Sequence, residues 1–302
     1  MRILTVRHRT TYTYDRPVTF GEHMLMVRPR DSHEFHLLES GLRLEPTGQV
    51  RWLFDIFGNS IARVEFQSGA DRLDIESRIT LEHHGIDLPD FQMVEDYAQR
   101  VPFCYPAEAV GDLARTHERH YSDPTHAVDA WARQYLGPDG TADTVELLMA
   151  MNRGVSNDFT YVRREEHGTQ TPVQTLEKGV GSCRDFALLF IEAVRSLGFA
   201  ARFVTGYLYD SAVDQPSEAA VRGAGATHAW ASVYLPGAGW VDFDPTNGLA
   251  GGQNLITVAT ARDPSQAIPV SGTYFGPAEA FSAMQVEVEV TQSPARTAEP
   301  AV

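Results

Sequence analysis

The fold is decided by one stretch, Gly179-Val180-Gly181-Ser182-Cys183-Arg184-Asp185-Phe186-Ala187-Leu188-Leu189-Phe190. Ser182 fits a helix N-cap, and Asp185 follows three residues later, which is the spacing of a capping box. This spacing predicts a helix that begins at Cys183. Free backbone N–H groups converge at a helix N-terminus and favour negative charge, so a thiol in that position is readily converted to a thiolate.

The predicted helix has an apolar side that should hold it in a core. Its apolar residues recur at helical spacing, at Phe186, Leu189, Phe190, Ala193 and Leu197. Gly198 follows at the position where a left-handed glycine commonly ends a helix. Cys183 would then lie at the rim of an anchored helix, with its own N–H free to face an oxyanion. By itself, this position suits a reactive thiol and a small buried hydrophobic residue equally well.

The second cysteine has no comparable surroundings. Cys104 stands between Phe103 and Tyr105, and we expect it to be inert. A disulfide between the two cysteines is the alternative, but two free thiols in a reducing compartment are the simpler expectation.

His228 and Asp244 lie on a predicted hairpin. The turn signal Pro236-Gly237-Ala238-Gly239 separates two apolar runs. Strand side chains alternate, so His228 should lie opposite or diagonal to a carboxylate of the second strand, either Asp242 or Asp244. That carboxylate would fix the imidazole tautomer and leave the other ring nitrogen for the Cys183 thiol. Read singly, these are ordinary strand and turn residues, but together they are the parts of a thiol acyl-transfer enzyme.

Composition narrows the classes of partner. The chain has 302 residues, 43% of them hydrophobic, and a formal net charge of −15, which argues against nucleic acid and anionic membranes as main partners. No apolar run approaches the length of a membrane span, and the N-terminus lacks the apolar segment of a signal peptide, so we expect a cytoplasmic protein. The oligomeric state is not specified by the sequence.

The first 85 residues predict a β-rich domain. Alternation from residue 4 to residue 14 places one set of side chains on a common face: Leu4, Val6, His8, Thr10, Tyr12 and Tyr14. Further short strands are expected at residues 23–28, 37–44, 50–57, 61–66 and 73–81, separated by turn residues. Regular short strands of this kind predict an antiparallel, sandwich-like β domain over residues 1–85.

The rest of the chain mixes helices and strands. A poorly patterned connector spans residues 86–110, and residues 111–250 combine expected helices at 127–136, 144–152 and from Cys183 with strands at 201–209, 229–235 and 240–243. Strands at 255–261 and 284–291 occupy a C-terminal segment, 251–291, before a tail, 292–302, that we expect to be disordered. The fold class is therefore α+β, with a helix bearing Cys183 packed on an antiparallel sheet bearing His228 and its aspartate.

Three blocks in order resemble the bacterial transglutaminase-like proteins. They are Gly181-Ser182-Cys183-Arg184-Asp185-Phe186-Ala187 with the following Ser196–Tyr207 segment, then Thr227-His228-Ala229-Trp230, then Gly239–Asn247 ending in Asp244-Pro245-Thr246-Asn247. His8–Tyr14 and Val27-Arg28-Pro29-Arg30 are similar to the β domain that precedes this core in many members. The resemblance covers most of the chain up to about Gly248.

The resemblance implies a fold and a set of roles. Residues 111–250 would form a papain-like, transglutaminase-like cysteine proteinase core, with Cys183 as nucleophile, His228 as base and acid, and Asp244 as the orienting carboxylate. It implies no cofactor and no metal. Tyr161 and Gln170 lie at plausible upstream positions for a second oxyanion donor, and neither is selected. Arg184 adds charge beside the thiol where many relatives carry glutamine, but we expect it to be a solvated first-turn arginine.

The expected reaction is attack of the Cys183 thiolate on an amide carbonyl of a peptide or protein substrate. The same acyl-enzyme serves hydrolysis, when water accepts the acyl group, and protein-glutamine transamidation or deamidation. Hydrolysis, as in a cysteine peptidase or amidase, is the function that the resemblance favours. A non-catalytic module that binds a peptide or partner is an alternative, as is a metal site at Cys183, His228 and Asp244, although their spacing matches no common metal motif.

Overall fold

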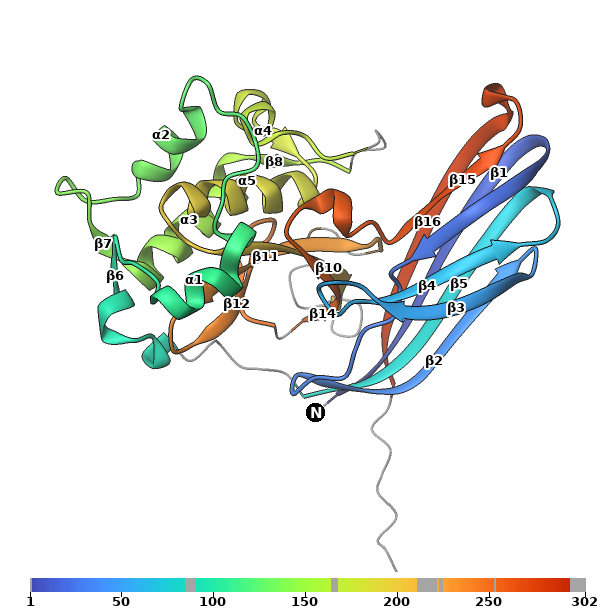
Figure 1. The fold of residues 1–302 in the computed structure, drawn as a ribbon, viewed down its shortest axis with the longest axis horizontal. Helices are drawn as coiled ribbons and strands as arrows, with labels where there is room; N and C mark the ends of the chain where they lie inside the picture. The colour runs from blue at the N-terminus through green and yellow to red at the C-terminus, as the bar shows by residue number, and fades with distance from the viewer. Residues whose placement is uncertain are drawn as a thin grey trace, which may run out of the picture.

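The protein consists of a helix-covered sheet on one side and a group of long antiparallel strands on the other (Figure 1). The computed structural model describes residues 2–84, 91–163, 168–210, 222, 225–252 and 254–293. Within these ranges no helix is both long and apolar enough to span a membrane. The mixed fold with antiparallel sheets confirms the expected α+β class.

The N-terminal strands form around one long strand, β1 (Arg2–Leu25). Leu4, Val6, His8 and Thr10 are buried on one face, as the alternation predicts. The first half of β1 pairs with β5 (Ala70–His83) and β16 (Phe281–Ser293), and its second half pairs with β4 (Ser60–Phe66) and β15 (Val270–Phe275). β2 (Phe35–Glu45) pairs with β5, and β3 (Gly48–Phe54) pairs with β4.

The separate strands expected at residues 4–14 and 23–28 belong to this single strand, which ends at Leu25. The polar run Asp15-Arg16-Pro17 interrupts the alternation in the sequence. In the structure, the pairing register shifts around this run instead of ending the strand. Such a bulge bends a strand and lets it pass from one set of partners to another.

The C-terminal strands are divided between the two parts of the molecule. β14 (Leu255–Ala261) joins the sheet of the core, whereas β15 and β16 return to pair with β1. β16 continues to Ser293, two residues into the tail that was expected to be disordered, and residues 294–302 lie outside the described residues. The last strands therefore tie the N-terminal sheet to the core.

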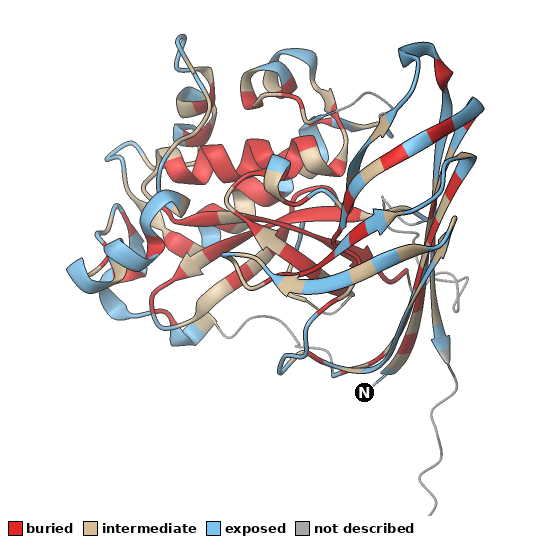
Figure 2. Cartoon of the chain, turned by 45° about the vertical axis from the view of Figure 1, so that its right-hand side comes forward, coloured by how far each residue is buried: buried red, intermediate tan, exposed pale blue. Residues whose placement is uncertain are grey.

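The core is a five-stranded antiparallel sheet covered on one face by helices. The strand order is β13 (Leu249–Ala250), β12 (Gly239–Asp244), β11 (His228–Leu235), β10 (Ala201–Leu208) and β14. The helix α5 (Cys183–Ser196) packs on β11 and β10 and is buried along most of its length (Figure 2). Around α5 lie α2 (Ala127–Arg133), α3 (Thr144–Asp158) and α4 (Pro172–Lys178). The short helix α1 (Ala107–Leu113) packs through Leu113 in a separate small cluster with Tyr105 and Ala200.

A shared hydrophobic cluster joins the two parts. It combines residues of the N-terminal sheet with residues on or near β10 and β14, namely Leu4, Val6, Ile79 and Leu81 with Tyr207, Tyr209, Ile256 and Val258. The Asn59 side chain adds a polar contact, because its Nδ2 donates to the Thr260 carbonyl at 2.7 Å and its Oδ1 accepts from the Thr260 N–H at 2.8 Å. The N-terminal strands are thus packed firmly against the core, which fixes their position relative to α5.

Candidate active site

Cys183 is the first residue of α5, as the capping pattern predicts. Asp185 Oδ2 accepts hydrogen bonds from the Ser182 backbone N–H at 2.8 Å and from Ser182 Oγ at 2.9 Å. The Cys183 side chain is 7% exposed and borders the apolar core that surrounds α5. The thiol is therefore buried at a helix N-terminus, where backbone N–H groups and the helix dipole favour a thiolate.

Gln170 holds the segments around this helix start. Its backbone N–H donates to Asp185 Oδ1 at 2.6 Å, and its side-chain Nε2 donates to the Val180 carbonyl at 3.0 Å. Because its side-chain amide already donates a hydrogen bond to the Val180 carbonyl, Gln170 is poorly suited to be the second oxyanion donor. Its hydrogen bonds to Asp185 and Val180 instead stabilise the turn that leads into Cys183.

Tyr161, the other candidate donor, lies beside the cysteine. The two-residue strand β8 (Thr160–Tyr161) pairs with β9 (Val180–Gly181), so that Tyr161 is opposite Gly181. Burial, followed by the nearby charges of Cys183 and Asp244, raises the pKa of Tyr161 to about 12. The phenol therefore keeps its proton at neutral pH and is available to donate a hydrogen bond.

His228 and Asp244 form a buried pair on the core sheet. His228 begins β11, Asp244 ends β12, and the register Ala231 opposite Phe243 makes the two residues diagonal neighbours. His228 Nε2 lies 2.8 Å from Asp244 Oδ2. Asp242, which sequence parity left as an alternative, instead accepts a hydrogen bond from Trp230 Nε1 at 2.9 Å.

Asp244 is held by two further hydrogen bonds. Its Oδ2 accepts from Asn247 Nδ2 at 2.7 Å and its Oδ1 accepts from the Thr246 N–H at 3.0 Å. Burial opposes ionisation, but the charge of His228 and these hydrogen bonds outweigh it, so the pKa of Asp244 is lowered. Asn247 escaped the sequence prediction, although its position three residues after the aspartate is typical of a side chain that closes a turn.

The imidazole of His228 carries a proton at neutral pH. Burial lowers its pKa, but the charge and hydrogen bond of Asp244, together with the Cys183 sulfur, raise it to about 10. Since Nε2 faces Asp244, the ring nitrogen left for the sulfur is Nδ1, which makes no hydrogen bond of ordinary geometry to the described residues. A buried imidazolium between a carboxylate and a thiol is the arrangement that supports a thiolate–imidazolium pair.

Trp230 supports the ring of His228 from one side. The two rings are stacked, with their centroids 6.0 Å apart and an interplanar angle of 28°. The indole is in turn fixed by its hydrogen bond to Asp242. The alternation of His228, Trp230 and Ser232 on one strand face was visible in the sequence, but the stacking contact was not.

Arg184 is not the solvated arginine that we expected. Its guanidinium donates to the Pro264 carbonyl at 2.7 Å and to the Ala267 carbonyl at 3.3 Å, and it lies 4.8 Å from the centre of the Phe203 ring. The 264–267 segment lies against the start of α5, and its carbonyls hold the guanidinium in a largely buried position. Burial lowers the pKa of Arg184, and the Cys183 charge is the foremost influence that opposes this shift.

The remaining sequence candidates lie apart from this cluster. Cys104 is exposed and, like Cys183, is a free thiol, in agreement with the expectation of two unpaired cysteines. Among the described residues, no group of three or more His, Cys, Asp or Glu side chains is arranged to hold a metal ion. The candidate site brings together the Cys183 thiol, the His228 imidazole, the Asp244 carboxylate and the Tyr161 phenol.

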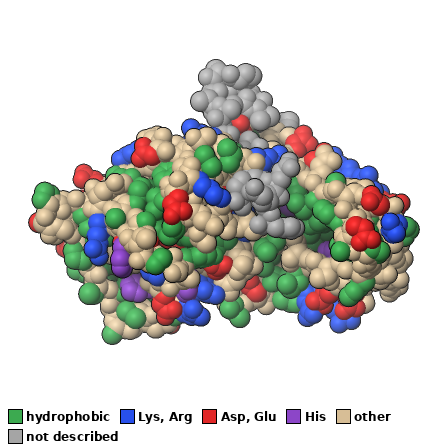
Figure 3. All heavy atoms as spheres, turned by 90° about the horizontal axis from the view of Figure 1, so that it is seen from above, with side chains coloured by type: hydrophobic (Ala, Val, Ile, Leu, Met, Phe, Trp, Pro, Cys, Tyr) green, Lys and Arg blue, Asp and Glu red, His purple; other side chains and the backbone are tan. Residues whose placement is uncertain are grey.

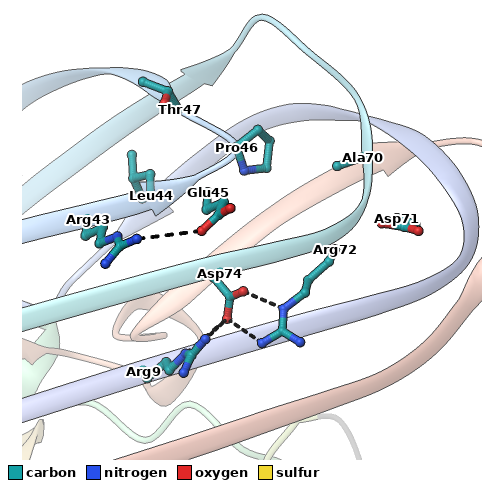
Figure 4. A pocket seen from close by; sticks show the side chains of 10 residues that line it. All are labelled: Arg9, Arg43, Leu44, Glu45, Pro46, Thr47, Ala70, Asp71, Arg72 and Asp74. Atoms are coloured by element: carbon teal, nitrogen blue, oxygen red, sulfur yellow. Dashed lines mark hydrogen bonds and ion pairs between the residues drawn. The ribbon is translucent and has the colours of Figure 1, made fainter.

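A hollow on the N-terminal strands is lined by none of the residues of this site. It has a volume of about 1010 Å³ and is lined by residues of β1, β2 and β5 and by Pro46 and Thr47, which follow β2 (Figure 4). Its arginines are neutralised by carboxylates, because Asp74 accepts from both Arg9 and Arg72, and Arg43 lies 3.9 Å from Glu45. Paired surface charges of this kind are typical of a solvated sheet face.

Comparisons with known proteins agree with the fold. Residues 4–82 match the bacterial transglutaminase-like N-terminal region, and residues 129–245 match the transglutaminase-like superfamily core. An uncharacterized protein of Mycobacterium tuberculosis is 30% identical over 306 residues, which cover 94% of this chain and 91% of the relative. One from Mycobacterium leprae is 24% identical over 312 residues, covering 96% and 98% of the two chains.

A solved structure shares the whole fold. It is described as "The Crystal Structure of a Putative Cysteine Protease from Cytophaga hutchinsonii", and it superposes with a TM-score of 0.73 at 19% identity. The match covers 97% of this chain and 92% of that protein. The combination of the N-terminal strands with the helix-covered sheet is thus common to both proteins.

Proposed function

Because the chain belongs to the transglutaminase-like superfamily, we propose that it is a thiol acyl-transfer enzyme that cleaves amide bonds in peptides or proteins. Cys183 is the nucleophile, His228 the acid and base, and Asp244 the orienting carboxylate. The observation that carries the proposal is the buried His228–Asp244 hydrogen bond beside a thiol at the start of α5. Membership of the superfamily by itself does not specify a reaction.

The first half of the reaction forms a thioester. The Cys183 sulfur attacks the amide carbonyl carbon, and the carbonyl electrons move onto oxygen. The Cys183 backbone N–H and the Tyr161 hydroxyl supply the hydrogen bonds that stabilise this oxyanion, a contribution that typically lowers a barrier by about 2.7–4 kcal/mol per donor. His228 then gives its Nδ1 proton to the amide nitrogen, the C–N bond breaks, and the amine leaves.

The second half releases the acyl group. His228, now neutral, takes a proton from water while the water oxygen attacks the thioester carbonyl. Collapse of that intermediate breaks the C–S bond and regenerates the thiolate and the imidazolium. Asp244 stays ionised throughout, since its pKa is already lowered, and it stabilises the imidazolium of the resting state. An amine in place of water would give transamidation from the same thioester.

A peptide-library incubation followed by mass spectrometry tests the proposal. The wild-type protein is compared with Cys183→Ala and, as a matched control, with Cys104→Ala. Shortened peptides that depend on Cys183 but not on Cys104 are the expected result. Loss of ammonia from glutamine side chains would point to deamidation or transamidation instead. No change that depends on Cys183 would support the non-catalytic alternative.

A further inference from the structure

The strand β16 has an edge that no other strand covers. One edge of β16 pairs with β1 over Ile3–Tyr14, and among the strands of the described ranges none pairs with the other edge. A free strand edge carries unpaired N–H and C=O groups, which form a ready template for an added strand.

Two contacts place the free edge beside the candidate active site. Arg163 Nη2 donates to the Val286 carbonyl at 3.3 Å, and Arg163 follows Tyr161 by only two residues. The Val288 N–H donates to the Gly225 carbonyl at 3.3 Å, and Gly225 precedes His228 by three residues. The segment that follows Tyr161 and the segment that precedes His228 therefore both contact β16, at Val286 and Val288.

These contacts also reveal which backbone groups face outward. In an antiparallel strand, alternate residues direct both their N–H and their C=O to the same side. The Val286 carbonyl and the Val288 N–H point away from β1, so Met284 and Val290 must also point their polar groups outward. Beyond the Arg163 contact, the Met284 N–H and C=O and the Val286 N–H make no hydrogen bond to any of the described residues and remain for another chain. The Met284 side chain is 47% exposed at this position.

The span from this edge to the nucleophile suits a short stretch of peptide. Tyr161 and Arg163 are separated by about 7 Å of extended chain, given about 3.3 Å per residue. The Arg163 side chain covers the rest of the span to the Val286 carbonyl, so a peptide whose carbonyl is at Cys183 would need several extended residues to reach Met284 or Val286. On the face shown in Figure 3, acidic and basic side chains are interspersed.

We propose that the outward edge of β16 binds the acyl-side segment of an extended peptide as an added strand, through the Met284 N–H and C=O and the Val286 N–H. The acyl side is the part that stays bonded to the enzyme as a thioester, so holding it keeps the intermediate in place while the amine leaves. The substrate class is an unfolded or extended segment of a protein, selected by its backbone more than by its sequence. This inference rests on the proposed function.

Peptidyl acyloxymethyl ketones of two lengths test the proposal. The Cys183 thiolate displaces the carboxylate group from the ketone methylene, so a C–S bond forms, a C–O bond breaks and the enzyme is inactivated. A hexapeptidyl ketone is expected to inactivate about tenfold faster than a dipeptidyl ketone with the same terminal residues, because it gains two or three backbone hydrogen bonds. Equal rates for the two lengths would overturn the proposal.

Two further measurements assign the gain to the edge. Met284→Pro removes an outward N–H, a change that edge strands accept. Met284→Pro should therefore cancel most of the faster inactivation by the hexapeptidyl ketone. Met284→Ala keeps the N–H and should retain the faster inactivation. N-methylation of single amide nitrogens of the hexapeptidyl ketone tests the same hydrogen bonds in the unaltered protein. Slower inactivation is expected when alternate positions are methylated. An unchanged rate at every position would overturn the proposal.

Iodoacetamide separates failure of this inference from failure of the proposed function. If Cys183 reacts with iodoacetamide but shows no advantage for the longer ketone, only the edge proposal is overturned. If Cys183 resists iodoacetamide and both ketones, the proposed function and the edge proposal are overturned together.

Discussion

His228 Nε2 and Asp244 Oδ2 are 2.8 Å apart, and both side chains are buried. The neighbouring carboxylate of Asp242 accepts a hydrogen bond from the Trp230 indole instead. The two aspartates are two residues apart on one strand face, yet only one of them contacts the imidazole. This arrangement gives a matched pair of substitutions. It also makes the role of each carboxylate separately measurable.

Asp244→Asn should lower Cys183-dependent amide cleavage by about 10²–10⁴-fold, because a carboxamide no longer stabilises the imidazolium or fixes its tautomer. Asp242→Asn keeps an acceptor for the Trp230 indole and should retain most of the activity. Rates of cleavage of a peptide identified by the library experiment check both. Equal losses in the two variants would count against Asp244 as the orienting carboxylate.

The pH dependence of stability should report the raised pKa of His228. Its folded-state pKa of about 10 lies above the usual value of 6.5, so the pair stabilises the folded protein fully below the usual value and loses this effect as pH rises through 10. Urea unfolding of wild type and His228→Gln should therefore differ most near pH 6 and converge at about pH 10. A constant difference across this range would show that the imidazole is not charged in the folded protein.

Arg184 should favour the Cys183 thiolate because its guanidinium is held next to the start of α5 by the Pro264 and Ala267 carbonyls. Arg184→Met is expected to slow alkylation of Cys183 near neutral pH by about tenfold, the effect of about 1.4 kcal/mol. Arg184→Lys keeps the charge and should recover part of the rate. If the methionine variant matches wild type, the arginine only packs against Phe203.

His8 should make the junction between the two parts of the molecule sensitive to acid. Its Nδ1 lies 3.0 Å from the Tyr207 hydroxyl and its Nε2 3.2 Å from Thr10 Oγ1, and burial lowers its pKa to about 4. The unfolded chain binds a proton below the usual value of 6.5, so stability is lost as pH falls from there toward 4, by up to about 3 kcal/mol. Urea unfolding at the two ends of this range should show a smaller loss in His8→Gln than in wild type.

Local signals predicted much of the framework. The alternation of Leu4, Val6, His8 and Thr10 gave the buried face of β1, and Ser182 with Asp185 gave the start of α5. The hairpin of β11 and β12 followed from its turn residues. Each of these features depends on neighbours within a few residues, where propensity and capping act directly.

Long-range contacts lay beyond such signals. Parity placed Asp242 and Asp244 on the same strand face, and only their partners Trp230, His228 and Asn247 separate them. Arg184 was misjudged because the segment that buries it lies about eighty residues further along the chain. The pairing of β16 with β1 likewise joins the two ends of the chain, a contact that no local pattern specifies.

Iodoacetamide labelling followed by peptide mass spectrometry tests the claim that Cys183 is a nucleophile activated by His228. Cys104 serves as the internal control, because it is exposed and lies outside the cluster. At about pH 6, where ordinary thiols are almost fully protonated, Cys183 should be alkylated faster than Cys104 despite being 7% exposed. His228→Ala should abolish that advantage and leave Cys104 unchanged. Faster labelling of Cys104 in the wild type, or an unaltered Cys183 rate in His228→Ala, would contradict the claim.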